Sequence, residues 1–148
     1  MRTRILHLVT LALVVLGLAS ASLASNEDDP GFKVIVNPSS KIEAVDRDFL
    51  RDAYLGKATE WGDGETIHPL DLASRFPARD KFTEHVIRKS PAQLRTYWNQ
   101  QIFSGKGVPP PEADAIADAI DYVVSTPGAV GYLPADADPG RAKVIRIK

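Results

Sequence analysis

Short apolar runs typical of β-strands alternate with helix-forming stretches along most of this chain. The strand-like runs are 32–37, 67–72, 129–133 and 143–147, and the helix-like stretches are 47–55 and three more that begin near residues 77, 90 and 112. This order of strand, helix, strand, three helices and two strands favours a mixed α/β domain. We therefore expect one small domain in which helices flank a mixed sheet.

Two of the helices have a clear limit or a clear apolar face. Asp46 is placed to cap a helix over 47–55. The stretch 112–125 has the most regular helical spacing of apolar side chains, which predicts a face packed on the core. Because proline cannot donate to a strand ladder, Pro69 places the strand 67–72 at the edge of a sheet.

The helix that begins at Ser90 carries an apolar stripe at helical spacing. Its members are Leu94, Tyr97, Trp98 and Ile102. We interpret Trp98 as a core residue on this stripe, since aromatic side chains on apolar faces usually pack inside. The alternative is that Trp98 lines a ligand cleft together with Trp61 and Tyr132.

The amino terminus has the composition of a cleavable secretory signal. Arg2 and Arg4 precede an apolar run of about 14 residues over 5–18, which is short of the roughly 20 residues that span a bilayer. Small residues follow, so we expect cleavage before Ser25, with 19–21 as a second site and an uncleaved anchor as the alternative. No cysteine follows the apolar run, which excludes a lipid-modified amino terminus. The predicted parts are a signal (1–24), a flexible tail (25–31) and a folded domain (32–148).

The composition after Ser25 argues against nucleic acid and against most enzyme chemistries. This part of the chain has 16 basic and 19 acidic residues, a net charge of −3, and no basic run. Without cysteine, and with only His68 and His85, it cannot assemble a thiolate-rich or histidine-rich metal site. We expect both histidines to be exposed, and we find no catalytic or nucleotide-binding motif. We therefore predict a binding protein with no catalytic residues, metal or cofactor, and keep an enzyme as the minor alternative.

The segment after the strand 67–72 has the chemistry of an anion site. Ser74 and Arg75 precede a helix that begins near Pro77, and Arg79 falls in its first turn. A helix amino terminus attracts anions, and arginine offers bidentate hydrogen bonds to phosphate or carboxylate. The alternative is that the serine caps the helix and that the two arginines pair with Asp71, Asp80 or Glu84. Ser39 and Ser40, after the first strand, are weaker candidates of the same kind.

Three segments in order resemble the substrate-binding proteins of phosphate ABC transporters. The segment 45–61, with Phe-Leu-Arg-Asp-Ala-Tyr-Leu-Gly-Lys and Trp61, is similar to their Leu-x-x-Ile-Phe-Leu-Gly-Lys-x-x-x-Trp stretch. The strand that ends at Asn37 and the Thr-Pro-Gly-Ala-Val-Gly-Tyr of 126–132 resemble two further segments of that family. Trp98 and the glycines of 105–107 fall where the family has a tryptophan and a glycine-rich connection. The resemblance covers nearly all of 32–133.

The resemblance implies part of the type II periplasmic-binding-protein fold and a periplasmic location. It also implies an anion ligand and a membrane transporter as partner. Two features depart from the family. No counterpart of its amino-terminal lobe segment precedes Phe32. The family's anion loop, an Arg followed by Gly-Ser-Gly-Thr, corresponds here to the stretch 71–79, which has no Ser-Gly-Thr and in which Ser74 and Arg75 match the loop's residue types.

Two hypotheses follow from the residues and the resemblance. The first is a periplasmic, non-enzymatic solute-binding protein that binds phosphate or another small anion weakly. The second is a protein-interaction module that keeps the fold without the ligand and acts beside a transporter or membrane sensor.

Overall fold

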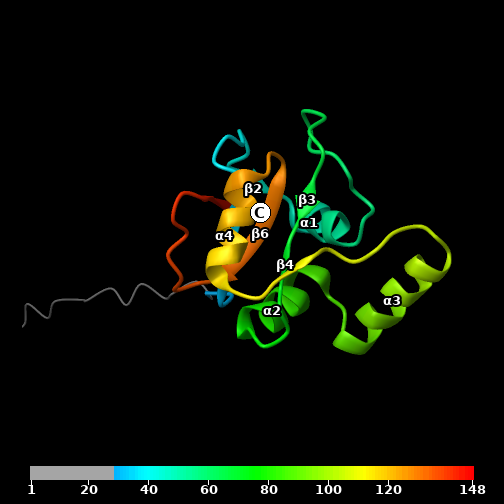
Figure 1. Cartoon of the computed structure of the whole chain (residues 1–148). Helices are drawn as coiled ribbons and strands as arrows, with labels where there is room; N and C mark the ends of the chain where they lie inside the picture. Colours follow the sequence, from blue (N-terminus) through cyan, green and yellow to red (C-terminus); the bar gives the residue numbers. More distant parts are fainter. Residues whose placement is uncertain (1–28) are drawn as a thin grey trace, which may run out of the picture.

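The structure is a computed structural model that describes residues 29–148, so the predicted signal and residues 25–28 of the predicted tail lie outside the described residues. The elements are β1 (Phe32–Val36), β2 (Ala44–Val45), α1 (Arg47–Tyr54), β3 (His68–Pro69), β4 (Asp71–Leu72), α2 (Pro77–Phe82), the π-helical segment η1 (Thr83–Ile87), α3 (Pro91–Phe103), β5 (Glu112–Ala113), α4 (Ile116–Ser125), β6 (Ala129–Pro134) and β7 (Lys143–Ile147). The predicted fold class, a mixed sheet flanked by helices, is confirmed (Figure 1).

The main sheet has five strands in the order β2-β7-β1-β6-β3. β1 lies at the centre, antiparallel to β6 and β7, while β2 and β3 extend the sheet in parallel with β7 and β6. Nearly all residues of β1 and β6 are buried, as expected for central strands that are covered on both faces. β3 is an edge strand, in agreement with the position of Pro69.

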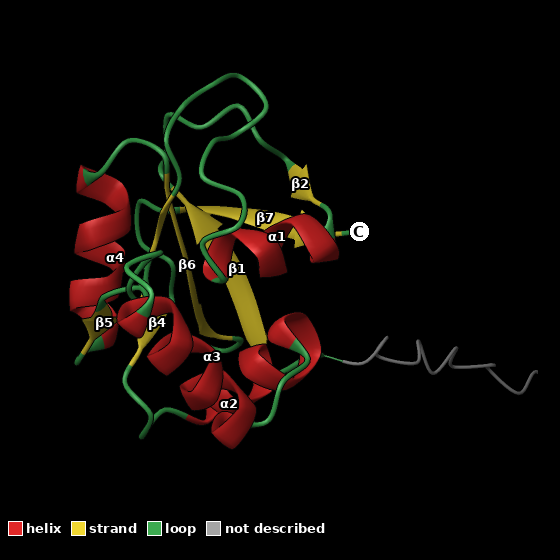
Figure 2. Ribbon diagram, turned by 90° about the vertical axis from the view of Figure 1, so that its right-hand side faces the viewer, coloured by secondary structure: helices red, strands yellow, loops and turns green. Residues whose placement is uncertain are grey.

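Helices pack on both faces of this sheet (Figure 2). Neighbouring side chains of a strand point to opposite faces, so Gly131 and Tyr132 of β6 mark the two sides. A Cβ atom at Gly131 would lie 3.1 Å from the side chain of Val123, so the glycine allows α4 to approach the sheet closely. On the other face Tyr132 stacks on Phe82 of α2, with ring centroids 4.0 Å apart. Phe32 and Tyr54 complete this aromatic core.

α1 begins where the sequence predicts. The Asp46 carboxylate accepts hydrogen bonds from the backbone N–H groups of Asp48 and Phe49. Trp61, placed after α1, is buried, and its Nε1–H donates to the carbonyl oxygen of Gly128 at 2.9 Å. This bond ties two of the segments that carry the family resemblance to each other.

Two predicted elements are interrupted. The strand 67–72 bends at Leu70, so that β3 pairs with β6 while β4 pairs with β5. The Tyr54 hydroxyl donates to the Leu70 carbonyl at 2.8 Å and fixes the bend. The helix predicted over 112–125 begins only at Ile116, because the backbone of 112–113 is extended and forms β5.

The prediction of a buried stripe on α3 is wrong. Each of the other helices has buried residues, whereas no residue of α3 is buried. Leu94, Tyr97 and Trp98 are half-buried and Ile102 is 52% exposed. α3 projects from the body (Figure 1), and the Tyr97 hydroxyl connects it to α1 by donating to the Leu55 carbonyl oxygen at 2.6 Å.

No helix within residues 29–148 is long and apolar enough to cross a bilayer.

Candidate functional site

A groove of about 370 Å³ separates α3 from the corner where β4 meets α2. Two of the predicted anion-site residues, Ser74 and Arg79, line its inner wall together with Asp71. The outer wall is formed by residues of α3, and Pro109, Pro110 and Glu112 also line the groove. The lining combines apolar side chains of α3 and the two prolines with five charged residues, which are Asp71, Arg79, Asp80, Arg95 and Glu112.

The inner wall is held together by the buried carboxylate of Asp71. Its Oδ2 lies 3.0 Å from Nη2 of Arg79. Its Oδ1 accepts hydrogen bonds from the Tyr132 hydroxyl and from the backbone N–H of Leu72. The charge of Asp71 is thus balanced by one guanidinium and two neutral donors, as a buried carboxylate requires.

Arg79 joins three elements at this point. Besides Asp71, its Nη1 contacts Oε1 of Glu112 at 2.9 Å and donates to the carbonyl oxygen of Leu72. Only 17% of its side chain is exposed. The guanidinium of α2 therefore fastens β4 to β5, and its charge is shared by two carboxylates.

Burial shifts the pKa values at this corner. It raises the pKa of the Asp71 carboxyl above its ordinary value, against the opposing effects of Arg79 and the two hydrogen bonds. It also raises the pKa of Tyr132 and of Tyr54 far above the ordinary value of 10.0, and the nearby Asp71 charge adds to both shifts. The two tyrosines are therefore neutral hydrogen-bonding groups in the folded protein.

The other predicted site residues do not join the groove. Arg75 pairs with Asp114 at 3.1 Å and stacks over the Phe76 ring. It is therefore engaged in an ion pair, as the alternative predicted, but its partner is none of the three carboxylates that the alternative named. Ser39 and Ser40 follow the end of β1 that lies away from α2. There, the Ser39 hydroxyl donates to the Asn37 side chain at 2.6 Å and the Ser40 hydroxyl accepts from the Ile42 N–H.

The outer wall contains the residues that sequence reasoning missed. Arg95 and Asn99 of α3 face the groove together with Trp98. Within residues 29–148 neither Arg95 nor Asp80, which lies at the groove's rim, has an ion-pair partner. The prediction that Trp98 is a core residue is wrong: Trp98 lines the groove, as the alternative stated. The other two residues of that alternative, Trp61 and Tyr132, are buried in the body. The sequence held no local signal for this wall, since the helical spacing of the stripe is the same for a core helix.

The predicted exposure of both histidines is confirmed. Within residues 29–148 no three histidine, cysteine or acidic side chains are grouped so that they could hold a metal ion. All buried polar side-chain atoms of this part of the chain have hydrogen-bond partners. The groove is the candidate ligand site because side chains that can donate hydrogen bonds, Ser74 on one wall and Arg95 and Asn99 on the other, line both of its walls.

The fold is similar to that of phosphate-binding transport proteins of known structure. A protein from Clostridium perfringens, described as a phosphate ABC transporter substrate-binding protein and solved with bound phosphate, matches with a TM-score of 0.61 at 17% identity over 79% of this chain and 44% of its own. An ABC-type phosphate transport receptor from Vibrio cholerae matches with a TM-score of 0.63 at 16% identity, over 79% and 46% of the two chains. PstS from Borrelia burgdorferi matches at 0.59 and 13% identity, over 80% and 47%.

These matches confirm the predicted resemblance at the level of the fold. The chain spans less than half the length of each of the three proteins. No protein-family model matches the chain, and a search of curated proteins finds no relative. The chain therefore has part of a periplasmic-binding-protein fold.

Proposed function

We propose that this chain is a periplasmic, non-enzymatic binding protein and that it takes a small anion in the groove between α3 and the β4–α2 corner. The observation that carries the proposal is the meeting of Ser74 and Arg79 with Arg95 and Asn99 across one groove. Arg79 is held by Asp71 and Glu112 and positions the inner wall, so the donors to a ligand in the groove are Ser74 on that wall and Arg95 and Asn99 on the other. The similarity to substrate-binding proteins supports a binding role.

The charges of the groove favour a singly charged organic anion over phosphate. Asp71, Asp80 and Glu112 line it against two arginines, of which Arg79 already serves two carboxylates. Doubly charged phosphate would be repelled by the carboxylates. A small carboxylate with an apolar part would use Arg95 as its charge partner and pack on Trp98 and the prolines. Because the groove is open on one side, we expect millimolar affinity.

Calorimetry on the chain from Ser25 onward tests this proposal. Benzoate should bind more tightly than acetate, and phosphate and sulfate least. Arg95→Gln should remove the heat, because it deletes the cation that faces the groove. Arg75→Gln is the matched control, since Arg75 lies outside the groove and pairs with Asp114. The absence of heat from all four anions at millimolar concentration would contradict the proposal.

The non-enzymatic part has a separate test. Phosphoesters and carboxylic esters should remain uncleaved by the purified chain. Turnover that is lost on substitution of His68 or His85 would show an active site at the exposed histidines and contradict this part of the proposal.

A protein-interaction module is the second candidate, and the state of the arginines favours it. Both Arg75 and Arg79 are engaged by carboxylates of this chain, so the predicted anion chemistry is largely satisfied internally. Under this candidate, a partner from a periplasmic extract is captured equally by the wild type and by Arg95→Gln, and no anion gives heat. Failure to capture any partner would remove its support.

A further inference from the structure

The end of α3 and the loop that follows it carry the most exposed large apolar side chains of residues 29–148. Phe103, the last residue of the helix, is 95% exposed, and Ile102 and Val108 are 52% and 73% exposed. Val144 of β7, at 46%, is the other exposed large apolar residue in this part of the chain. Ile102 and Phe103 end α3, which projects from the body (Figure 1), and Val108 lies in the loop that leads from α3 back to β5. We call Ile102, Phe103 and Val108 the apolar tip.

The arm that carries this tip has the opposite charge from the rest of the protein. Residues 85–111 contain Arg88, Lys89, Arg95 and Lys106 and no aspartate or glutamate. The remainder of the chain from Ser25 has 12 basic and 19 acidic residues. Arg88 is held by Asp48 at 3.6 Å, whereas Lys106 lies three residues from Phe103 and has no ion-pair partner within the described part of the chain. The arm is therefore complementary to an anionic surface, and the body is repelled by one.

The size and shape of the tip favour a lipid surface over a protein surface. Specific protein interfaces bury about 800 Å² on each partner and involve some 20 residues a side, whereas this tip consists of three side chains on a projecting end. Pairing of two such arms from two copies would bring like charges together. A bilayer interface accepts a small projecting apolar group without a matching pocket, and anionic headgroups attract nearby lysine and arginine.

We propose that the apolar tip is a reversible membrane contact. Phe103, with Ile102 and Val108, enters the interfacial region of an anionic bilayer, Lys106 contacts its headgroups, and the acidic body faces the aqueous phase. The two signals together give weak binding, because neither a few apolar side chains nor a few basic residues suffice alone. Ile102 also lines the groove, but Phe103 and Lys106 do not, so the contact made by these two residues does not depend on whether the groove binds an anion.

Vesicle co-sedimentation of the chain from Ser25 onward tests the proposal. The probe is vesicles of phosphatidylglycerol and phosphatidylethanolamine at low and at physiological salt, compared with vesicles of phosphatidylcholine. Wild type should bind the anionic vesicles, and more weakly as salt rises. Phe103→Ser should weaken binding about tenfold or more, through the lost apolar insertion. Lys106→Gln should weaken it about fivefold.

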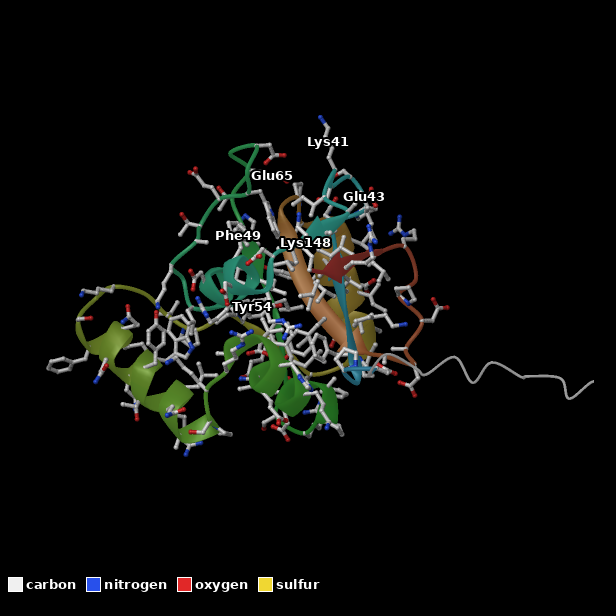
Figure 3. All side chains as sticks on the ribbon, turned by 180° about the vertical axis from the view of Figure 1, so that it is seen from behind. Lys41, Glu43, Phe49, Tyr54, Glu65 and Lys148 are labelled. Atoms are coloured by element: carbon white, nitrogen blue, oxygen red, sulfur yellow. The ribbon has the colours of Figure 1, made fainter. Side chains whose placement is uncertain are left out.

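Two substitutions on the body are matched controls. Val144→Ser removes an exposed apolar side chain from β7, and Lys41→Gln removes a lysine from the loop after β1, which lies far from α3 (Figure 3). Both should bind vesicles as the wild type does. Urea unfolding should show that Phe103→Ser is as stable as the wild type, since the side chain is exposed.

Three outcomes would overturn the proposal. One is the absence of binding to anionic vesicles at low salt. Another is binding that Phe103→Ser leaves unchanged. The third is a salt-sensitive oligomer that dissociates on Phe103→Ser without any vesicle binding, which would assign the tip to a second copy of the chain.

Discussion

The two walls of the groove are built in opposite ways. At the β4–α2 corner, Asp71, Arg79 and Tyr132 are almost enclosed and bonded to one another. Across the groove, α3 has no buried residue and ends in an exposed phenylalanine. The charged groups of the corner hold the fold, whereas Arg95, the one charged residue of α3, has no ion-pair partner within residues 29–148. A charged residue that lines a groove is therefore a ligand candidate only if it is not already ion-paired within the protein.

The largest contrast between the walls is expected from two phenylalanines. Phe82→Ala should lower the free energy of unfolding by about 3–5 kcal/mol, because Phe82 is fully buried and stacks on Tyr132. Phe103→Ala should change it by less than about 0.5 kcal/mol. Urea unfolding of both variants measures the contrast. A loss above about 1 kcal/mol for Phe103→Ala would show that α3 packs in solution on something else.

Two arginines give the next contrast. Arg79→Met should destabilise the fold by about 3 kcal/mol, since it leaves the buried Asp71 carboxylate without its cation. Arg75→Met should cost less than about 1 kcal/mol, because the Arg75–Asp114 pair is exposed. Equal effects of the two substitutions in urea unfolding would contradict the view that only the corner depends on its charges.

Alkaline titration separates the buried tyrosines Tyr54 and Tyr132 from Tyr97 of α3. The folded pKa values of Tyr54 and Tyr132 lie well above 10.0, so the native state keeps protons that the unfolded chain releases. Their contribution to stability is therefore fully present below about pH 10 and is lost as the pH rises further. Phenolate absorbance should show these two ionising only as circular dichroism reports unfolding, after Tyr97 of α3. Early ionisation of all four tyrosines in a folded protein would contradict this.

The smallest expected effect concerns Asp71 at acid pH. Its folded pKa is raised above 3.8, so the native state binds a proton more tightly than the unfolded chain does. The corresponding stability is full below 3.8 and is lost as the pH rises through the folded pKa. The free energy of unfolding, measured with urea across this pH range, should lose the part of its pH dependence that comes from Asp71 in the Asp71→Asn variant. The Asp80→Asn variant, which changes another carboxylate of the groove, should keep that part. An unchanged slope in Asp71→Asn would contradict the shift.

Local chemistry predicted most of the fold and little of the site. The cap at Asp46, the edge position of Pro69 and all four strand-like runs could be found because each depends on neighbours in sequence. The bend at Leu70 could not, since it depends on Tyr54 and on the pairing of β4 with β5. The spacing of α3 predicts an apolar stripe correctly, but periodicity does not reveal whether the stripe's partner belongs to the same chain.

The candidate site shows the same limit. Ser74 and Arg79 reach the groove because they flank the start of α2, which the sequence places well. The contact between Arg79 and Glu112 joins residues 33 positions apart, and no local pattern announces it. Arg75, four residues before Arg79, pairs with Asp114 outside the groove. Residue types therefore predicted that the start of α2 belongs to the site, but they did not predict which of its arginines form ion pairs within the chain.

The central strand of the sheet finds its partners late in the chain. β1 is hydrogen-bonded to β6 on one side and to β7 on the other. Residues 32–36 therefore cannot form their ladders until residues 129–147 are present. Contacts of such large sequence separation make folding slow, because a long loop must be closed before any hydrogen bond of the ladder forms. During synthesis the sheet cannot assemble until those last strands are made. Until they are made, β1 has no ladder partner, so the nascent chain leaves the apolar side chains of this strand uncovered.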